Sequence, residues 1–215
     1  MLQNMPVSDA AICLRILDCG VEPASLASCL SDAFSSGLWR DTPMPVGHVS
    51  DPDSAWGILS GLGEKPISVA TIGTDGVLGC VLGVILTPEL ITLYGLGPWD
   101  AKPGDGLLAF IGIATDCQGK RVSQDTDGRF VLNSDLDNPS FARCLFERWL
   151  TSSKLKDCPR VFIRTRRRIA AVRHLARGFG FSECGRFQIF FRRHRQFRLV
   201  YRRTHKGVPV FWNAP

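Results

Sequence analysis

Residues 111–123, IGIATDCQGKRVS, are the run of the chain best suited to chemistry. The run joins a continuously apolar segment, typical of a buried strand, to a polar loop that contains Gln118, Gly119 and Lys120. A loop that leads into a helix presents unpaired backbone N–H groups at the positive end of the helix dipole. Glycine lets such a backbone approach a bound group closely. Such N–H groups can cradle a phosphate, so this run is a candidate binding loop.

Metal and disulfide chemistry fit the sequence poorly. The chain has eight cysteines without a CxxC pair, and several lie in apolar stretches such as VLGCVLG and ARCLFERWL. These cysteines are interpreted as small core residues. The four histidines, at positions 48, 174, 194 and 205, show no metal-ligand spacing. The sequence therefore predicts neither a bound metal nor a disulfide framework.

Charge is distributed very unevenly along the chain. The net charge is +6, but residues 160–206 contain fifteen Lys or Arg and a single acid, Glu183, so this stretch carries +14 and the rest carries −8. The preferred interpretation is a solvated basic face that also attracts the phosphates of a cofactor. The alternative is a polyanionic partner such as RNA.

The bulk composition indicates a folded globular domain. Hydrophobic residues make up 45% of the 215 residues and charged residues 21%. No apolar run reaches the roughly 18 residues that a membrane-spanning helix needs. The first ten residues lack the basic and apolar regions of a secretory signal. A cytoplasmic protein without a membrane partner is expected.

Apolar periodicity and turn residues predict the elements that position the 111–123 run. In chain order these are a strand (11–17), two helices (23–36 and 54–62), a hairpin (66–86), a buried strand (107–114), a helix (140–155), a strand (160–165), a helix closed by glycine 178 or 180, and two strands in the tail (186–204). This order predicts an α/β (α+β) fold. We expect a mixed central sheet of about six to seven strands with helices on both faces.

This order resembles that of the GNAT superfamily of acyl-CoA-dependent N-acyltransferases. Residues 111–123 look like the family's central strand and pyrophosphate loop, whose pattern Q/R-x-x-G-x-G/A opens at Gln118. Residues 172–181 are similar to the family's fourth helix, where Leu175, Gly180 and Phe181 match. The resemblance implies a single domain over residues 1–215, with an insertion at about 124–138.

Acetyl-CoA is the acyl donor that the resemblance implies. Its pantetheine arm would pair with the central strand, and an N–H near Ile113 would polarise the thioester carbonyl. A β-bulge is expected at Gly112. The cofactor-binding residues implied in this way are Ile111, Gly112, Ile113, Gln118, Gly119, Lys120, Arg121, Val122 and Ser123.

Three positions depart from the family pattern. Arg121 stands where the family has glycine, and Ser123 where it has glycine or alanine. Ala176 takes the place of a tyrosine that often protonates the departing thiolate. We expect Arg121 to compensate by touching phosphate, because a guanidinium suits that anion.

The general base and the acceptor pocket rest on weaker signals. In some relatives a carboxylate base lies at the position of Leu107, which cannot serve, so Asp105 and Glu89 are the candidates. The alternatives are a turn aspartate in PGDG and a loop carboxylate in TPEL. Tyr94 and Trp99, in the glycine-rich segment 90–106, are candidates for binding the acceptor.

Three functions remain open from the sequence. The first is transfer of an acetyl-type group from coenzyme A to the amine of a small molecule or peptide, by a monomer or homodimer. The second is acetylation of a nucleic-acid-bound amine such as aminoacyl-tRNA, which the basic C-terminal third favours. The third is a non-catalytic GNAT scaffold, which Arg121, Ser123 and Ala176 favour.

Overall fold

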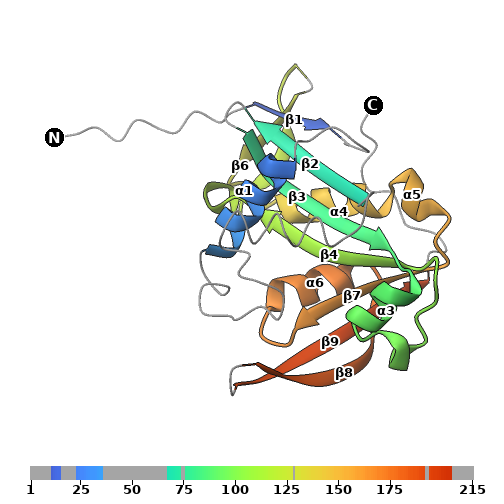
Figure 1. Cartoon of the computed structure of the whole chain (residues 1–215). Helices are drawn as coiled ribbons and strands as arrows, with labels where there is room; N and C mark the ends of the chain where they lie inside the picture. Colours follow the sequence, from blue (N-terminus) through green and yellow to red (C-terminus); the bar gives the residue numbers. More distant parts are fainter. Residues whose placement is uncertain are drawn as a thin grey trace.

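A single mixed sheet runs through the part of the chain that the computed structural model describes, which is residues 11–15, 23–35, 67–73, 76–127, 129–191 and 194–204 (Figure 1). The strands are β1 (Ala11–Arg15), β2 (Ile67–Gly73), β3 (Gly76–Ile85), β4 (Gly106–Ile113), β5 (Arg121–Gln124), β6 (Phe130–Asn133), β7 (Arg160–Arg166), β8 (Ser182–Phe191) and β9 (His194–Thr204). The helices are α1 (Pro23–Ser35), α3 (Pro88–Leu93), α4 (Phe141–Leu150), α5 (Ser153–Lys156) and α6 (Ala170–Gly178), with short 3-10 turns η2 (Gly97–Trp99) and η3 (Thr115–Cys117). The helix expected at 54–62 lies outside the described residues.

The strand order is β5-β6-β1-β2-β3-β4-β7-β9-β8. Neighbouring strands are antiparallel except for β4 and β7, which are parallel. The predicted mixed sheet with helices on both faces is confirmed. The described residues form nine strands, more than the expected six to seven, because part of the insertion folds into the pair β5 and β6.

One face of the sheet is covered by α4, α5 and α6. Phe146 and Trp149 of α4 pack there with Ile163 of β7 in a hydrophobic core. Trp149 fits because Gly83 on β3 has no side chain, and a Cβ there would collide with the indole ring. The indole N–H of Trp149 donates to the carbonyl of Ile67 at 3.1 Å, which ties α4 to β2.

The opposite face carries α1 and α3. The predicted four-residue spacing of Leu26, Leu30 and Phe34 is confirmed, because all three side chains are buried in the core beneath α1. A Cβ on Gly112 of β4 would lie 3.0 Å from Leu30, so this glycine lets α1 pack directly on the central strand. Among the described residues, no helix is long and apolar enough to cross a membrane.

The loop after β4 lies beside the start of the next long helix, α4, although the inserted residues separate the two in the sequence. Strands β5 and β6 form an antiparallel hairpin that joins the sheet next to β1. The chain then returns, so that the N–H of Val122 donates to the carbonyl of Pro139 at 3.0 Å. The N–H of Phe141 donates to the carbonyl of Lys120, also at 3.0 Å. Helix α4 therefore begins at Phe141, next to the loop, despite the inserted residues.

Candidate functional site

The sheet opens between β4 and β7. The two parallel strands pair at Gly106 with Val161, Leu107 with Phe162 and Leu108 with Ile163, and the pairing ends there. Figure 1 shows the strands close together at one end and spread apart at the other, with α6 beside the opening. Beyond Leu108, the edge of β4 that faces β7 therefore has no strand partner among the described residues.

The main chain of Ile111 and Ile113 faces this opening. The N–H of Ala114 donates to the carbonyl of Leu78 at 2.9 Å, and Gly79 is the register partner of Ile113. In an antiparallel ladder this pattern makes Gly79 and Ile113 a non-hydrogen-bonded pair, whose N–H and C=O groups point away from each other. The same holds for Ile111, two residues earlier, so both isoleucines present main-chain polar groups to the gap. The main chain of Gly112, by contrast, points at β3.

The β-bulge predicted at Gly112 lies elsewhere. The β3–β4 register shifts between Leu82 and Gly83, because Leu82 pairs with Phe110 and Gly83 pairs with Leu108. Ala109 is the extra residue, immediately after the last pair with β7. A bulge bends and twists its strand. Its position at Ala109 explains why β4 leaves β7 at this point.

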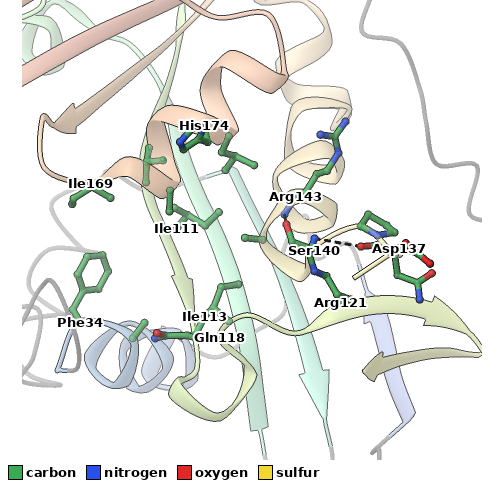
Figure 2. Close-up of a pocket in the computed structure, with 17 residues that line it drawn as sticks. Phe34, Ile111, Ile113, Gln118, Arg121, Asp137, Ser140, Arg143, Ile169 and His174 are labelled. Carbon is green, nitrogen blue, oxygen red and sulfur yellow. Dashed lines mark hydrogen bonds between the residues drawn. The ribbon is translucent and has the colours of Figure 1, made fainter. Parts of the chain in front are cut away.

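A cavity of about 950 Å³ occupies the opening. It reaches both faces of the sheet, because Phe34 of α1 lines one side and α4 and α6 line the other. Figure 2 shows Ile111 between α4, which carries Arg143, and α6, which carries His174, with Ile113 further along β4 beside Gln118. The lining residues are Ala33, Phe34, Ile111, Ile113, Gln118, Arg121, Asp137, Asn138, Pro139, Ser140, Ala142, Arg143, Ile169, Ala171, Val172, His174 and Leu175.

The N-terminus of α4 forms one wall of this cavity. Ser140 is the N-cap, and its hydroxyl accepts a hydrogen bond from the N–H of Arg143 at 3.3 Å. Phe141 donates its N–H to Lys120. Among the hydrogen bonds of the described residues, none uses the N–H of Ala142. The wall thus offers an available N–H donor at the positive end of a helix, the arrangement that binds phosphate.

Two predicted cofactor residues of the loop, Gln118 and Arg121, also line the cavity. The side-chain amide of Gln118 donates to the carbonyl of Ile113 at 3.1 Å, which holds the loop against the open edge of β4. Arg121 is half-buried, and its Nη1 donates to the carbonyl of Asn138 at 3.4 Å. Its buried Nε has no hydrogen-bond acceptor among the described residues. The contact with Asn138 uses one of the guanidinium's five N–H groups, so other N–H groups of Arg121 are left to donate to a ligand in the cavity.

Ile111 and Ile113 line the cavity as well, whereas the remaining predicted cofactor residues do not: Gly112, Gly119, Lys120, Val122 and Ser123. Val122 is buried in the core beneath α4, and the hydroxyl of Ser123 accepts a hydrogen bond from Asn133 at 2.7 Å. Gly119 adopts a φ of 78°, so it makes the turn that only glycine adopts easily. Lys120 contributes its carbonyl to α4. Together with Gly112, these residues shape the loop and the strand.

Besides Ala33 and Phe34 of α1, the structure adds two lining segments that the sequence analysis did not assign, 137–143 and 169–175. A serine followed by an apolar periodic run is an N-cap signature, so Ser140 could have been identified from the sequence. The second segment belongs to α6, where His174 lines the cavity. Ala176, which aligns with the family's tyrosine, is instead fully buried in the core. Its departure from the family pattern therefore falls outside the cavity.

The predicted catalytic carboxylates are not at the cavity. Asp105 is fully buried and accepts two hydrogen bonds from Arg160, at 2.8 and 3.1 Å, and one from the N–H of Lys102 at 2.8 Å. It fastens the start of β4 to the start of β7, at the closed end of the opening. Glu89 is exposed in the first turn of α3, where the hydroxyl of Thr87 lowers its pKa. The geometry argues against both residues as the general base.

Tyr94 and Trp99, the predicted acceptor-binding residues, pack on β7 and β8 instead of lining the cavity. The guanidinium of Arg164 lies 4.9 Å from the ring centroid of Tyr94, and burial raises the pKa of this tyrosine. The Trp99 ring is 5.2 Å from that of Phe187. Both aromatic residues thus anchor the segment between β3 and β4.

Around this site, the part of the chain that the structure describes offers neither a metal-ligand cluster nor a reactive thiol. Among the described residues, no group of three or more His, Cys, Asp or Glu could hold a metal ion. Cys117 lies buried beneath the loop, and burial, followed by the nearby Asp116, raises the pKa of its thiol. A neutral buried thiol is a poor nucleophile.

The fold and the splayed strands define the class: this chain has the GNAT fold. It superposes on the ribosomal-protein-S18-alanine N-acetyltransferase of Escherichia coli with a TM-score of 0.53 at 11% identity, over 94% of this chain and 98% of that one. For an N-acetyltransferase of Staphylococcus aureus the TM-score is 0.53 at 12% identity, over 93% and 100%. For NAA60 of Arabidopsis thaliana, solved with a bisubstrate analogue, it is 0.54 at 12%, over 90% and 97%. No protein-family model and no curated protein matches the sequence. The predicted resemblance is confirmed at the level of the fold.

Proposed function

We propose that this protein is an acyl-CoA-dependent N-acetyltransferase that acts on the amine of a peptide or small molecule. The observation that carries the proposal is the opening between β4 and β7, because a cavity there combines an unpaired strand edge with a helix N-terminus. Solved proteins with this fold include enzymes named for acetylating protein alanine residues, which supports a peptide acceptor.

Each part of the cavity would have one task. The open edge of β4, at Ile111 and Ile113, would bind the pantetheine arm through main-chain hydrogen bonds. The N–H of Ala142 and the guanidinium of Arg121 would hold the diphosphate. Bound acetyl-CoA would supply an activated acetyl group as its thioester. The N–H of Ile113 would then donate to the thioester oxygen and stabilise the negative charge that develops on it.

Proton transfer is assigned to His174. Among the described lining residues, two side chains are of the types that serve as general acids or bases, His174 and Asp137. Asp137 lies beside Asn138 and Pro139, at the end assigned to phosphate, whereas His174 lies on α6 opposite Ile111 (Figure 2). Imidazole is the group that most often transfers protons in enzymes. His174 would accept a proton from the attacking amine or protonate the departing thiolate.

Calorimetry with acetyl-CoA tests the proposal. Arg121→Ala should weaken binding by about 1–3 kcal/mol, the scale of a charge-assisted hydrogen bond. Arg129→Ala is the matched control, because Arg129 is exposed in the turn of the same hairpin. Absence of binding at millimolar acetyl-CoA would refute the proposal that the protein is an acetyl-CoA-dependent enzyme. Tighter binding by Arg121→Ala would show that Arg121 obstructs the site, which would favour a non-catalytic scaffold.

The nucleic-acid alternative has less support than the sequence suggested. Arg166, Arg198 and Arg203 belong to the basic C-terminal third, yet all three are buried. The surface charge of this region is correspondingly smaller than the sequence count. Two of the departures that favoured a non-catalytic scaffold, Ser123 and Ala176, also lie outside the cavity.

A further inference from the structure

A carboxylate of α1 holds the turn that follows β4. Both oxygens of Asp32 accept hydrogen bonds from Thr115: Oδ2 from its N–H at 2.6 Å and Oδ1 from its hydroxyl at 3.0 Å. The two residues are 83 positions apart in the sequence. Hydrogen bonds to an ionised carboxylate are roughly twice as strong as those between neutral groups. This contact, the Asp32–Thr115 pair, therefore connects α1 to the start of the candidate cofactor loop.

Thr115 is the first residue in a series of hydrogen bonds that leads to the cavity. Its carbonyl accepts the N–H of Gln118 at 3.2 Å, at the end of the 3-10 turn η3. The side-chain amide of Gln118 donates in turn to the carbonyl of Ile113 at 3.1 Å. Gln118 and Ile113 both line the cavity, and Figure 2 shows them beside each other. Asp32 is therefore linked to the cavity wall through Thr115 and Gln118, although it does not line the cavity itself.

Helix α1 is the firmly packed side of this contact. Its apolar face is buried against the sheet at Leu26, Leu30 and Phe34. The turn, by contrast, is exposed at Thr115, Asp116, Gln118 and Gly119. A short exposed turn has few buried contacts, so its local opening costs little free energy. The Asp32–Thr115 pair therefore holds the turn on a helix that the core already fixes.

We propose that Asp32 is a positioning residue for coenzyme A, because through Thr115 it holds the cofactor loop in its binding conformation before the cofactor arrives. The inference rests on the proposed function, which assigns Ile113 to the thioester and Arg121 to the diphosphate, one on each side of the turn. A loop that is already fixed in its bound conformation loses less conformational entropy when the ligand binds, so the affinity is higher.

Calorimetry with coenzyme A measures this contribution. Asp32→Ala should raise the Kd about tenfold, the lower end of the range for hydrogen bonds to a charged group. Asp32→Asn should restore most of the affinity, because its amide oxygen accepts the Thr115 N–H and its amide N–H₂ donates to the hydroxyl oxygen. Asp116→Asn is the matched control, since it removes an exposed charge from the same turn and leaves the Asp32–Thr115 pair intact.

Amide hydrogen exchange, measured by NMR on the protein without coenzyme A, reports on the turn directly. The N–H of Gln118 donates to Thr115, so it should be protected in the native protein. In Asp32→Ala this N–H should exchange at least about tenfold faster, because the turn opens more often. The N–H of Thr151, which donates to Glu147 at the end of α4, should keep its exchange rate. If Asp32→Ala does not fold, as judged by its melting curve, Thr115→Val takes its place, since it removes the hydroxyl and leaves α1 unchanged.

Three results would overturn the inference. The first is equal exchange of the Gln118 N–H in the native protein and in Asp32→Ala, and the second is an equal Kd for coenzyme A. The third is a Kd for Asp32→Asn as weak as that of Asp32→Ala, which would assign the effect to the charge instead of the hydrogen bonds. If the native protein does not bind coenzyme A, the proposed function fails. The exchange experiment contains no cofactor, so it would still decide whether Asp32 holds the turn.

Discussion

The substitution Asp105→Asn separates a structural role from a catalytic one. Asp105 is fully buried, and its two oxygens accept three hydrogen bonds, two from Arg160 and one from the N–H of Lys102. Asparagine keeps the size of the side chain but removes its charge and directs an amide N–H₂ at donors. Arg160 would then lose its buried counter-charge at the end of the sheet where β4 and β7 are hydrogen-bonded to each other.

The expected cost follows from this geometry. Breaking a buried ion pair typically destabilises by about 3–5 kcal/mol. The Arg160 side chain is 17% exposed and keeps its contact with Asp100, so the lower end applies, about 3 kcal/mol. In a domain of this size each kcal/mol lowers the melting temperature by about 2–4 °C, which gives a fall of about 6–12 °C. Asp100→Asn, at the exposed end of the same network, should melt like the native protein.

Calorimetric melting and acetyl-CoA titration at 20 °C test this reasoning together. Asp105→Asn should melt early but bind acetyl-CoA, and transfer acetyl groups, like the native protein at that temperature. The opposite pattern, native melting with lost transfer, would show that Asp105 acts as the base and that its burial was misinterpreted.

Three further outcomes are expected. Gly83→Ala should destabilise the fold by about 1–3 kcal/mol, because its Cβ would lie 2.6 Å from the carbonyl of Leu107 and collide with Trp149; Gly97→Ala, which meets open space, is the control, and equal melting would refute the packing argument. Burial raises the pKa of Cys144 to about 12 and of Cys158 to about 11, so alkylation at pH 9 should label both only after unfolding, as measured by mass spectrometry. Because these pKa values are raised, the stability from the neutral thiols is present below the ordinary value of 9.0 and declines as pH rises above it; rapid labelling of the native protein would contradict this. His174→Gln should lower kcat about a hundredfold with unchanged affinity for coenzyme A, and an unchanged kcat would exclude His174 from proton transfer.

Local pattern was enough to predict most elements of the described chain. The apolar run at 107–114 and the four-residue spacing of Leu26, Leu30 and Phe34 correspond to β4 and α1. Gly180, with a φ of 76°, follows the end of α6 as the glycine signal indicated. These predictions succeed because each depends only on neighbouring residues: the spacing of apolar side chains in a helix, the apolar run of a buried strand, and the left-handed backbone conformation of a glycine.

The candidate site could be predicted only in part. Gln118 and Arg121 were predicted to bind the cofactor from the resemblance of a short loop pattern, and both line the cavity. The predictions for Asp105, Tyr94 and Trp99 used proximity along the sequence, and each residue proved to be held by partners far away in the chain. Asp105 pairs with Arg160, 55 residues later, and this contact has no local signature.

The sequence by itself determined the alternation of elements, the buried central strand and the glycine-containing loop, since each is encoded within a few neighbouring residues. Only the tertiary structure decided where β4 leaves β7, because that depends on an extra residue at Ala109 relative to the β3 register. It also decided that inserted residues return the loop to the start of α4, through hydrogen bonds from Val122 and Phe141. The cavity is formed by segments from Ala33 to Leu175, and the burial and charge that define it arise only when those segments pack together.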